Sequence, residues 1–219
     1  MNKKTMILMA LVALFLIGCG VLSSQTNIFE HPSCSPPCWE GITPGLTTKE
    51  EALNVLSKLN MIDQPIVDPN QAFINFDDAF PFTFYHDINR WGFIYIFDGK
   101  VSTIAFDNKL NLNLQQAVEL FGNPKIILVE HAGEYDSAMF INPEKGISFG
   151  YRFHLDETSV VGPDATIDSV AFFDAKQYQS VLSSGLLSFT HLNADEILNR
   201  MRPWKGYGSI YQYDSTSTP

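Results

Sequence analysis

The chain is poor in positive charge. Its 219 residues include 14 Lys and Arg against 24 Asp and Glu, which gives a formal net charge of −10. Binding to nucleic acid phosphates requires clusters of Lys and Arg, and electrostatic docking on anionic lipid depends on such clusters as well. The composition therefore disfavours both a nucleic-acid partner and attachment to a membrane through charge alone.

The sequence also lacks the short motifs of common enzyme and cofactor sites: it has no H-E-x-x-H, G-x-S-x-G, P-loop or G-x-G-x-x-G pattern. His154 with Asp156 and Glu157 would allow a metal site near a strand end. Oxygen ligands of the kind that calcium prefers are carried by Asp68, Asn70, Asp77 and Asp78. Neither group has the spacing of a known metal-binding loop. A His stands next to a carboxylate in His86-Asp87 and in Glu130-His131. Adjacent side chains on a strand point to opposite faces, so neither pair can act together in catalysis without other partners. We expect no catalytic residue, no metal and no cofactor.

Long hydrophobic runs are missing except for one at the beginning of the chain. Met6 to Ile17 is an apolar run of twelve residues that follows Lys3 and Lys4. Such a run is too short to cross a hydrocarbon core of about 30 Å and has the length of the apolar region of an export signal. We therefore expect the rest of the protein to be exported.

The end of this run resembles the lipobox of bacterial lipoproteins, since Leu16-Ile17-Gly18 leads directly into Cys19. The resemblance implies that 1–18 is a cleaved signal peptide, that Cys19 is acylated, and that the protein is a membrane-anchored lipoprotein on the extracytoplasmic face of the cell membrane. Two or three acyl chains would hold it there stably. Loss of the signal would leave 12 basic against 24 acidic residues, a charge of −12. The alternative is an uncleaved anchor in which Cys19 is unmodified.

Cysteine is scarce, with three in the chain, and Cys34 and Cys38 form a pair once Cys19 is assigned to lipid. Exported proteins meet an oxidising environment, so we expect a disulfide that closes a small, proline-containing loop. A redox-active dithiol or a metal-binding thiol pair stays open as an alternative, although the C-x3-C spacing differs from the C-x-x-C of redox motifs.

The remaining pattern predicts an α+β protein of two similar units. Residues 19–33 are polar and small and predict a flexible tether. Thr47 or Thr48 caps an amphipathic helix that continues to about Leu59, and Asp98-Gly99 is typical of a hairpin turn. Further expected elements are a helix at 112–121, strands at 125–130, 138–141, 147–153 and 167–173, and a helix at 193–201. Each unit, 34–111 and 112–182, is expected to pack a short helix on a small antiparallel sheet, with a partial third unit in 183–219.

The helix beginnings resemble those of a known group of exported domains. Gly41 to Ala52 is similar to the helix start of BamE/SmpA-like and β-lactamase-inhibitor-protein-like lipoprotein domains, and Leu114 to Val129 repeats that element. The stretch from Pro36 to Ile42 also resembles uncharacterised exported lipoproteins of environmental bacteria. The resemblance implies a helical segment on a small antiparallel sheet, sometimes in tandem, which binds other proteins and catalyses nothing.

From these observations we expect a non-catalytic protein-binding or envelope scaffold module. Most aromatic side chains of the first sheet are expected in the core. Those on its outer face, namely Trp91, Tyr95 and Phe84, are the candidates for contact with an envelope protein, because aromatic residues are enriched at interfaces. The alternative is that these side chains serve the core alone. The alternative is a solute-binding lipoprotein or an enzyme whose site is assembled from residues distant in the sequence. A polar pocket with converging titratable groups would favour this alternative.

Overall fold

The structure is a computed structural model that describes residues 28–29, 33–62, 78–84, 87–107, 110–132, 135–154, 160–184 and 193–213. The helices are α2 (Lys49–Leu56), α3 (Leu114–Phe121), α4 (Tyr178–Ser183) and α5 (Ala194–Arg200), with 3₁₀ turns η1 (Ala175–Gln177) and η2 (Ile210–Gln212). The strands are β1 (Asp78–Phe84), β2 (Asp87–Phe97), β3 (Lys100–Asp107), β4 (Ile126–Ala132), β5 (Tyr135–Asn142), β6 (Ile147–His154), β7 (Val160–Val161), β8 (Ser169–Phe173), β9 (Met201–Pro203) and β10 (Gly208–Ser209). The predicted signal peptide, 1–18, and Cys19 lie outside the described residues.

Three of the four α-helices within the described ranges begin with a reciprocal capping box. The boxes are formed by Thr48 with Glu51, by Asn113 with Gln116, and by Asn193 with Glu196. In α3 the Gln116 backbone N–H donates to Asn113 Oδ1 at 2.8 Å, and the Asn113 N–H donates to Gln116 Oε1 at 2.9 Å. These bonds satisfy N–H groups that have no partner within the helix. The helix starts predicted at Thr48 and Asn193 are thus confirmed, whereas the second helix begins at Leu114, two residues after the predicted start at 112.

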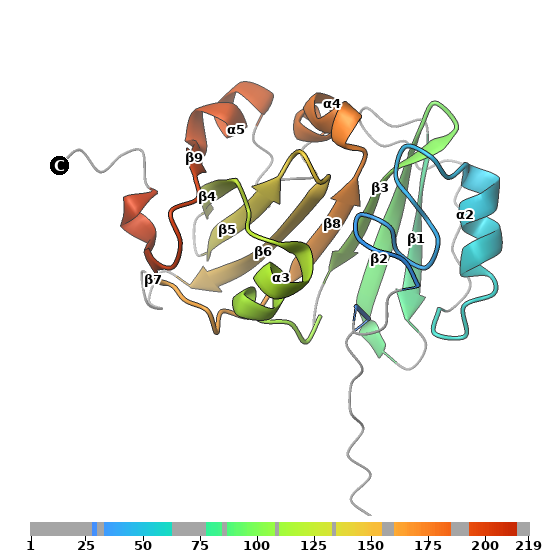
Figure 1. Cartoon of the computed structure of the whole chain (residues 1–219), viewed down its shortest axis with the longest axis horizontal. Coiled ribbons are helices and arrows are strands. Elements are labelled where there is room, and N and C mark those ends of the chain that lie inside the picture. The colour runs from blue at the N-terminus through green and yellow to red at the C-terminus, as the bar shows by residue number, and fades with distance from the viewer. Residues whose placement is uncertain are drawn as a thin grey trace, which may run out of the picture.

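Eight strands form one antiparallel sheet in the order β1-β2-β3-β8-β6-β5-β4-β9 (Figure 1). The β2–β3 hairpin turns at Asp98 and Gly99, whose φ angles of 51° and 68° are both in the left-handed region that such turns require. A second meander, β4 to β6, follows α3 along the chain. The two short strands β7 and β10 pair with each other outside this sheet.

Strand β8 joins the two meanders. Val170 of β8 pairs with Phe106 of β3 on one side and with Phe149 of β6 on the other. The α+β class is therefore confirmed, but the expected pair of small sheets is not, because the strands of both segments belong to a single sheet. The predicted unit boundary near residue 111 lies between two halves of that sheet.

The main hydrophobic core lies on one face of the sheet, beneath α2 and α3. Trp39 and Phe82 stack in it with ring centroids 5.6 Å apart. Phe29 also belongs to this core: it is 4% exposed and lies edge-on to Phe106 and Phe121, each at 5.4 Å. The predicted tether, 19–33, therefore extends too far, because its residue Phe29 is part of the folded body.

A smaller hydrophobic cluster occupies the opposite face over β4, β5 and β8. Leu128, Met139, Ile141 and Phe173 of the sheet pack there against Val181 and Leu182 of α4 and Ile197 of α5. The strands are thus covered on both faces in this half, by different helices. No helix in the described part of the chain has the length and apolar character needed to cross a membrane.

Candidate functional site

Strand β2 carries a row of three aromatic side chains on the face opposite the main core. Side chains alternate along a strand, so Trp91, Phe93 and Tyr95 share this face while Ile94 and Ile96 point into the main core. The ring centroids are 4.8 Å apart for Trp91 and Phe93 and 5.9 Å apart for Phe93 and Tyr95. The row is therefore a continuous aromatic surface along one strand.

The aromatic side chains of the row become less exposed from Trp91 towards Tyr95. Trp91 and Phe93 are half-buried, whereas Tyr95 is 8% exposed. Burial raises the pKa of Tyr95 to about 12, and the negative charge of Asp107 adds to the effect. The end at Trp91 is thus the part of the row that an outside molecule can contact.

An ionic cluster lies on the same face beside Trp91. The guanidinium of Arg152 on β6 lies 3.6 Å from Asp107 (Nη2 to Oδ1) and 3.9 Å from Asp168 (Nε to Oδ2). The Arg152 backbone N–H also donates to Asp168 Oδ2 at 2.7 Å. Burial raises the pKa of the Asp168 carboxyl, and Asp107 adds to this, while the backbone hydrogen bond and the positive charge of Arg152 oppose it.

Strand register brings the aromatic row and the ionic cluster together. Asp107 pairs with Trp91 on one side and with Ser169 of β8 on the other, and Ser169 pairs in turn with Gly150 of β6. The Ser169 hydroxyl is buried and has no hydrogen-bond partner among the described residues. Arg152 lies two residues beyond Gly150 and therefore on the same face. Four neighbouring strands thus contribute to one patch.

This patch has the chemistry of a contact surface for another macromolecule. The Arg152 side chain is 43% exposed and is oriented by two carboxylates. Trp91, three strands away on β2, offers a partly exposed ring beside Asp107. Both residue types are enriched among the residues that dominate binding energy at interfaces. No group of three or more His, Cys, Asp or Glu in the described ranges has the arrangement of a metal site.

The structure separates the three aromatic residues predicted to bind a partner. Trp91 and Tyr95 belong to the row, but Phe84 is 5% exposed and lies in the main core, 6.4 Å from Trp39. Phe84 faces the core because it is an even-numbered residue of β1, in step with Phe80 and Phe82. Phe84 is therefore not part of the aromatic row on the outer face.

Most of the other candidate residues named from the sequence lie outside the described part of the chain. His154 is exposed at the end of β6, while Asp156, Glu157, Asp68, Asn70 and Asp77 lie outside the described residues. Glu130 is fully buried and accepts a hydrogen bond from the Ser137 hydroxyl at 3.2 Å. The Sγ atoms of Cys34 and Cys38 lie at disulfide-bonding distance, as their spacing predicts.

Sequence reasoning missed Asp107, Arg152 and Asp168. Their alignment depends on β8 lying between β3 and β6, and the sequence carries no local sign of that pairing. A charged residue within a mostly apolar strand indicates the outward face of that strand, so the position of Arg152 alone could have pointed to this site.

Comparisons with protein-family models, with curated proteins and with solved structures find no match for this chain.

Proposed function

We propose that this protein is a lipid-anchored, extracytoplasmic module that binds another protein of the cell envelope without catalysing a reaction. The observation that carries the proposal is the patch formed by Trp91, Arg152, Asp107 and Asp168 on one face of the sheet. A partly exposed Trp and an oriented Arg on the same sheet face are residue types typical of binding hot spots. We name these four residues the Trp91 patch.

The charges of the Trp91 patch favour a specific partner over a generally apolar one. Arg152 is flanked by two carboxylates, so the patch carries one positive and two negative groups in fixed positions. A partner must place complementary groups opposite them, because a buried charge without a counterpart is costly. Trp91 supplies apolar contact area at the β2 edge of this arrangement, beside Asp107.

The anchor is the second part of the proposal and is supported by the sequence. The apolar run before Cys19 has the length of an export signal, and the body that follows is acidic, so a lipid is its most direct means of attachment. Mass spectrometry of the intact protein extracted from its native membrane should find acyl chains on Cys19. An unmodified thiol at that position would contradict the anchor.

The Trp91 patch is tested by photo-crosslinking in the native membrane, with a photoreactive group placed beside Trp91. We expect one crosslinked protein from the wild type and a loss of that product in Trp91→Ala. Truncation of a hot spot costs about 2 kcal/mol or more, which corresponds to roughly thirty-fold in Kd. Val160→Ala is the matched control, since Val160 is 51% exposed on β7, outside the patch. Equal crosslinking in both variants would contradict the proposed surface.

We also propose that the two halves of the sheet are structural repeats of one helix-and-meander unit. In the first half the N-cap residue of α2, Thr48, pairs with Lys100 at the start of β3. In the second half the N-cap residue of α3, Asn113, pairs with Thr166 just before β8. This similarity supports a repeat in which β3 and β8 are equivalent strands.

A further inference from the structure

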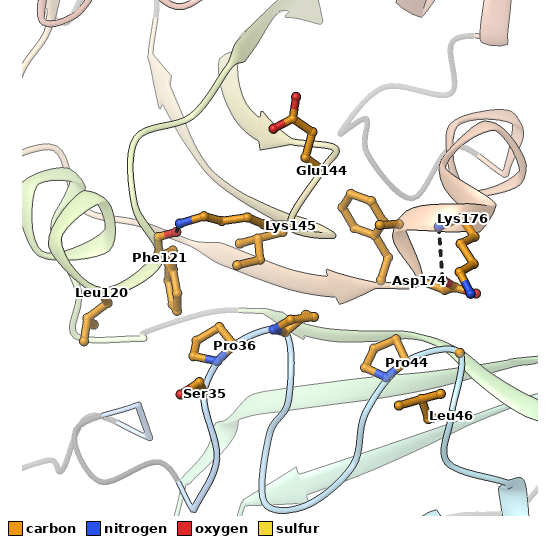
Figure 2. A pocket seen from close by; sticks show the side chains of 15 residues that line it. Ser35, Pro36, Pro44, Leu46, Leu120, Phe121, Glu144, Lys145, Asp174 and Lys176 are labelled. Atoms are coloured by element: carbon orange, nitrogen blue, oxygen red, sulfur yellow. Dashed lines mark hydrogen bonds between the residues drawn. The ribbon is translucent and has the colours of Figure 1, made fainter.

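A cleft with a volume of about 650 Å³ lies between the disulfide loop and the second half of the sheet. Figure 2 shows Pro36 and Pro44 on one side of it, with Phe121, Lys145 and Asp174 on the other. Pockets that bind small ligands span roughly 300–1000 Å³ and combine apolar walls with a few polar groups. The cleft has this size and this composition, and it lies apart from the Trp91 patch.

One wall of the cleft is built from proline. Pro36 and Pro37 belong to the loop between Cys34 and Cys38, and Pro44 follows in the next turn. The Gly41 N–H donates to the Cys34 sulfur at 3.4 Å, which ties the loop back onto the chain. Proline fixes its own backbone angle, so this wall presents apolar rings that lose little conformational freedom when a ligand binds.

The opposite wall carries a cation held in place at one end. Lys145 lies in the turn between β5 and β6, and its ammonium group donates to the Phe121 carbonyl at 3.2 Å. The side chain crosses Gly122, where a Cβ atom would come within 2.5 Å of Lys145 Nζ. Lys145 is exposed, and this bond places its ammonium group at the end of α3, where it retains N–H donors beyond the one that this carbonyl accepts.

A carboxylate is held at the other end of the cleft. Asp174 Oδ1 accepts a hydrogen bond from the Lys176 backbone N–H at 3.0 Å, which caps η1. The carboxyl group lies against Gly45, where a Cβ would come within 2.7 Å of it. Figure 2 places Asp174 and Lys145 at opposite ends of the cleft, with apolar side chains between them. Two more charged residues, Glu144 and Lys176, are exposed at the rim.

We propose that this cleft binds a short peptide with free termini and an apolar side chain. The peptide carboxylate pairs with Lys145, its ammonium group pairs with Asp174, and its side chain packs on Pro36 and Pro44. The proposal follows from charge complementarity, because a cation and a carboxylate at opposite ends of an apolar cleft match a zwitterionic chain. This binding is separate from the proposed contact at the Trp91 patch.

The test is calorimetric titration of the full chain with the tripeptide Ala-Leu-Ala. We expect saturable one-to-one binding, and we expect N-acetylation or C-amidation of the peptide each to weaken it at least about tenfold, since each removes a charge-assisted hydrogen bond. Absence of binding, or equal binding of the free and doubly blocked tripeptides, would overturn the proposal.

Two conservative variants assign the ends of the peptide. Asp174→Asn keeps an oxygen to cap η1, and Lys145→Gln keeps an N–H donor for the Phe121 carbonyl. In Asp174→Asn the free and N-acetylated peptides should bind equally, while C-amidation still weakens binding. In Lys145→Gln the pattern should be reversed.

Matched controls separate this pattern from a general change in charge or stability. Asp164→Asn and Lys58→Gln alter exposed residues outside the cleft. Both variants should still prefer the free peptide over its N-acetylated and its C-amidated forms. Thermal unfolding of every variant shows which proteins are folded under the titration conditions. If either cleft variant keeps full discrimination between free and blocked peptides while folded, that end of the assignment is overturned.

Discussion

At the scale of single residues, Gly92 shows how closely the main core is packed. A Cβ atom at this position on β2 would collide with the ring of Phe82, which is fully buried and stacked on Trp39. The ring of Phe82 thus occupies the space in which any other residue at position 92 would carry its side chain. Such cross-strand contacts between an aromatic ring and a glycine help to fix the register of a sheet.

We expect Gly92→Ala to lower the free energy of unfolding by about 1–3 kcal/mol, because overpacking a core forces neighbouring side chains from their preferred positions. Urea denaturation monitored by circular dichroism measures the effect. Gly162→Ala is the control: no atom lies within 4 Å of a Cβ there, so we expect a change within about 0.5 kcal/mol. A neutral Gly92→Ala would show that Phe82 is not held against this strand.

Buried tyrosines make stability dependent on alkaline pH. Burial raises the pKa of Tyr95, Tyr151 and Tyr178 to about 12 from 10.0. The folded protein therefore holds these protons more tightly than the unfolded chain does. The stabilisation is complete below pH 10 and is lost as the pH rises towards 12.

The free energy of unfolding should accordingly fall between pH 10 and pH 12, by up to about 1.4 kcal/mol per pH unit for each such tyrosine. In Tyr95→Phe the free energy of unfolding should fall less steeply with pH, because one of the three buried tyrosine protons is missing. Tyr211→Phe, at a position that is 58% exposed, serves as the comparison. Equal slopes in the wild type and Tyr95→Phe would mean that Tyr95 titrates normally.

At the scale of single elements, α3 depends on its capping box. The Asn113 side chain accepts the Gln116 N–H, so Asn113→Ala leaves that donor without its partner and should cost about 1 kcal/mol of stability. Chemical denaturation gives the value. Asn54→Ala, in the exposed middle of α2, should be neutral or slightly stabilising because alanine has the highest helix propensity. A similar decrease in the free energy of unfolding in both variants would argue that the capping box of Asn113 and Gln116 does not stabilise α3.

The disulfide loop is the second element whose contribution can be measured. Cys34 and Cys38 are four residues apart, and loop-closure entropy for so small a ring predicts a loss of about 2 kcal/mol when both are replaced by serine. Thermal unfolding with and without reductant should show the loss in the wild type only on reduction. Thiol labelling of the unfolded, unreduced protein should find both cysteines blocked, and reactive thiols would contradict the bond.

At the scale of the whole molecule, the repeat proposal predicts two units of local stability. Native-state hydrogen exchange should show the amides of β1 to β3 opening as one group and those of β4 to β6 as another, because each meander is stabilised chiefly by contacts within itself. A single opening free energy for all eight strands would argue that the halves are not separate units.

Short sequence patterns predict most helices and strands of this fold. They do not predict how the strands are ordered in the sheet, because that order depends on pairing between strands far apart in the sequence. Thr48, Asn113 and Asn193 mark helix starts through bonds to residues three positions later, and Asp98-Gly99 marks a turn between adjacent strands. The pairing of β8 with β3 joins residues about 65 positions apart, and no local pattern encodes it. Helix α4 went unpredicted because it has six residues and no side-chain cap.

The same distinction explains the candidate site. Trp91 and Tyr95 were predicted from alternation along a single strand, and that alternation holds in the structure. Arg152 and Asp107 meet only because β8 separates β6 from β3 by one strand. Phe84 lies on the core face because it alternates in step with Phe80 and Phe82 along β1. The aromatic character of Phe84 alone does not show which face it occupies.

The burial of Phe29 limits how far the body can stand from its anchor. If Cys19 carries the lipid, eight residues lie between it and Ile28, where the described structure begins, so nine Cα–Cα steps join the two. A fully extended chain covers at most about 3.6 Å per residue, so the span is no more than roughly 32 Å. The body would then stay close to the lipid headgroups, and its partner would have to present its contact surface at that same height above the bilayer.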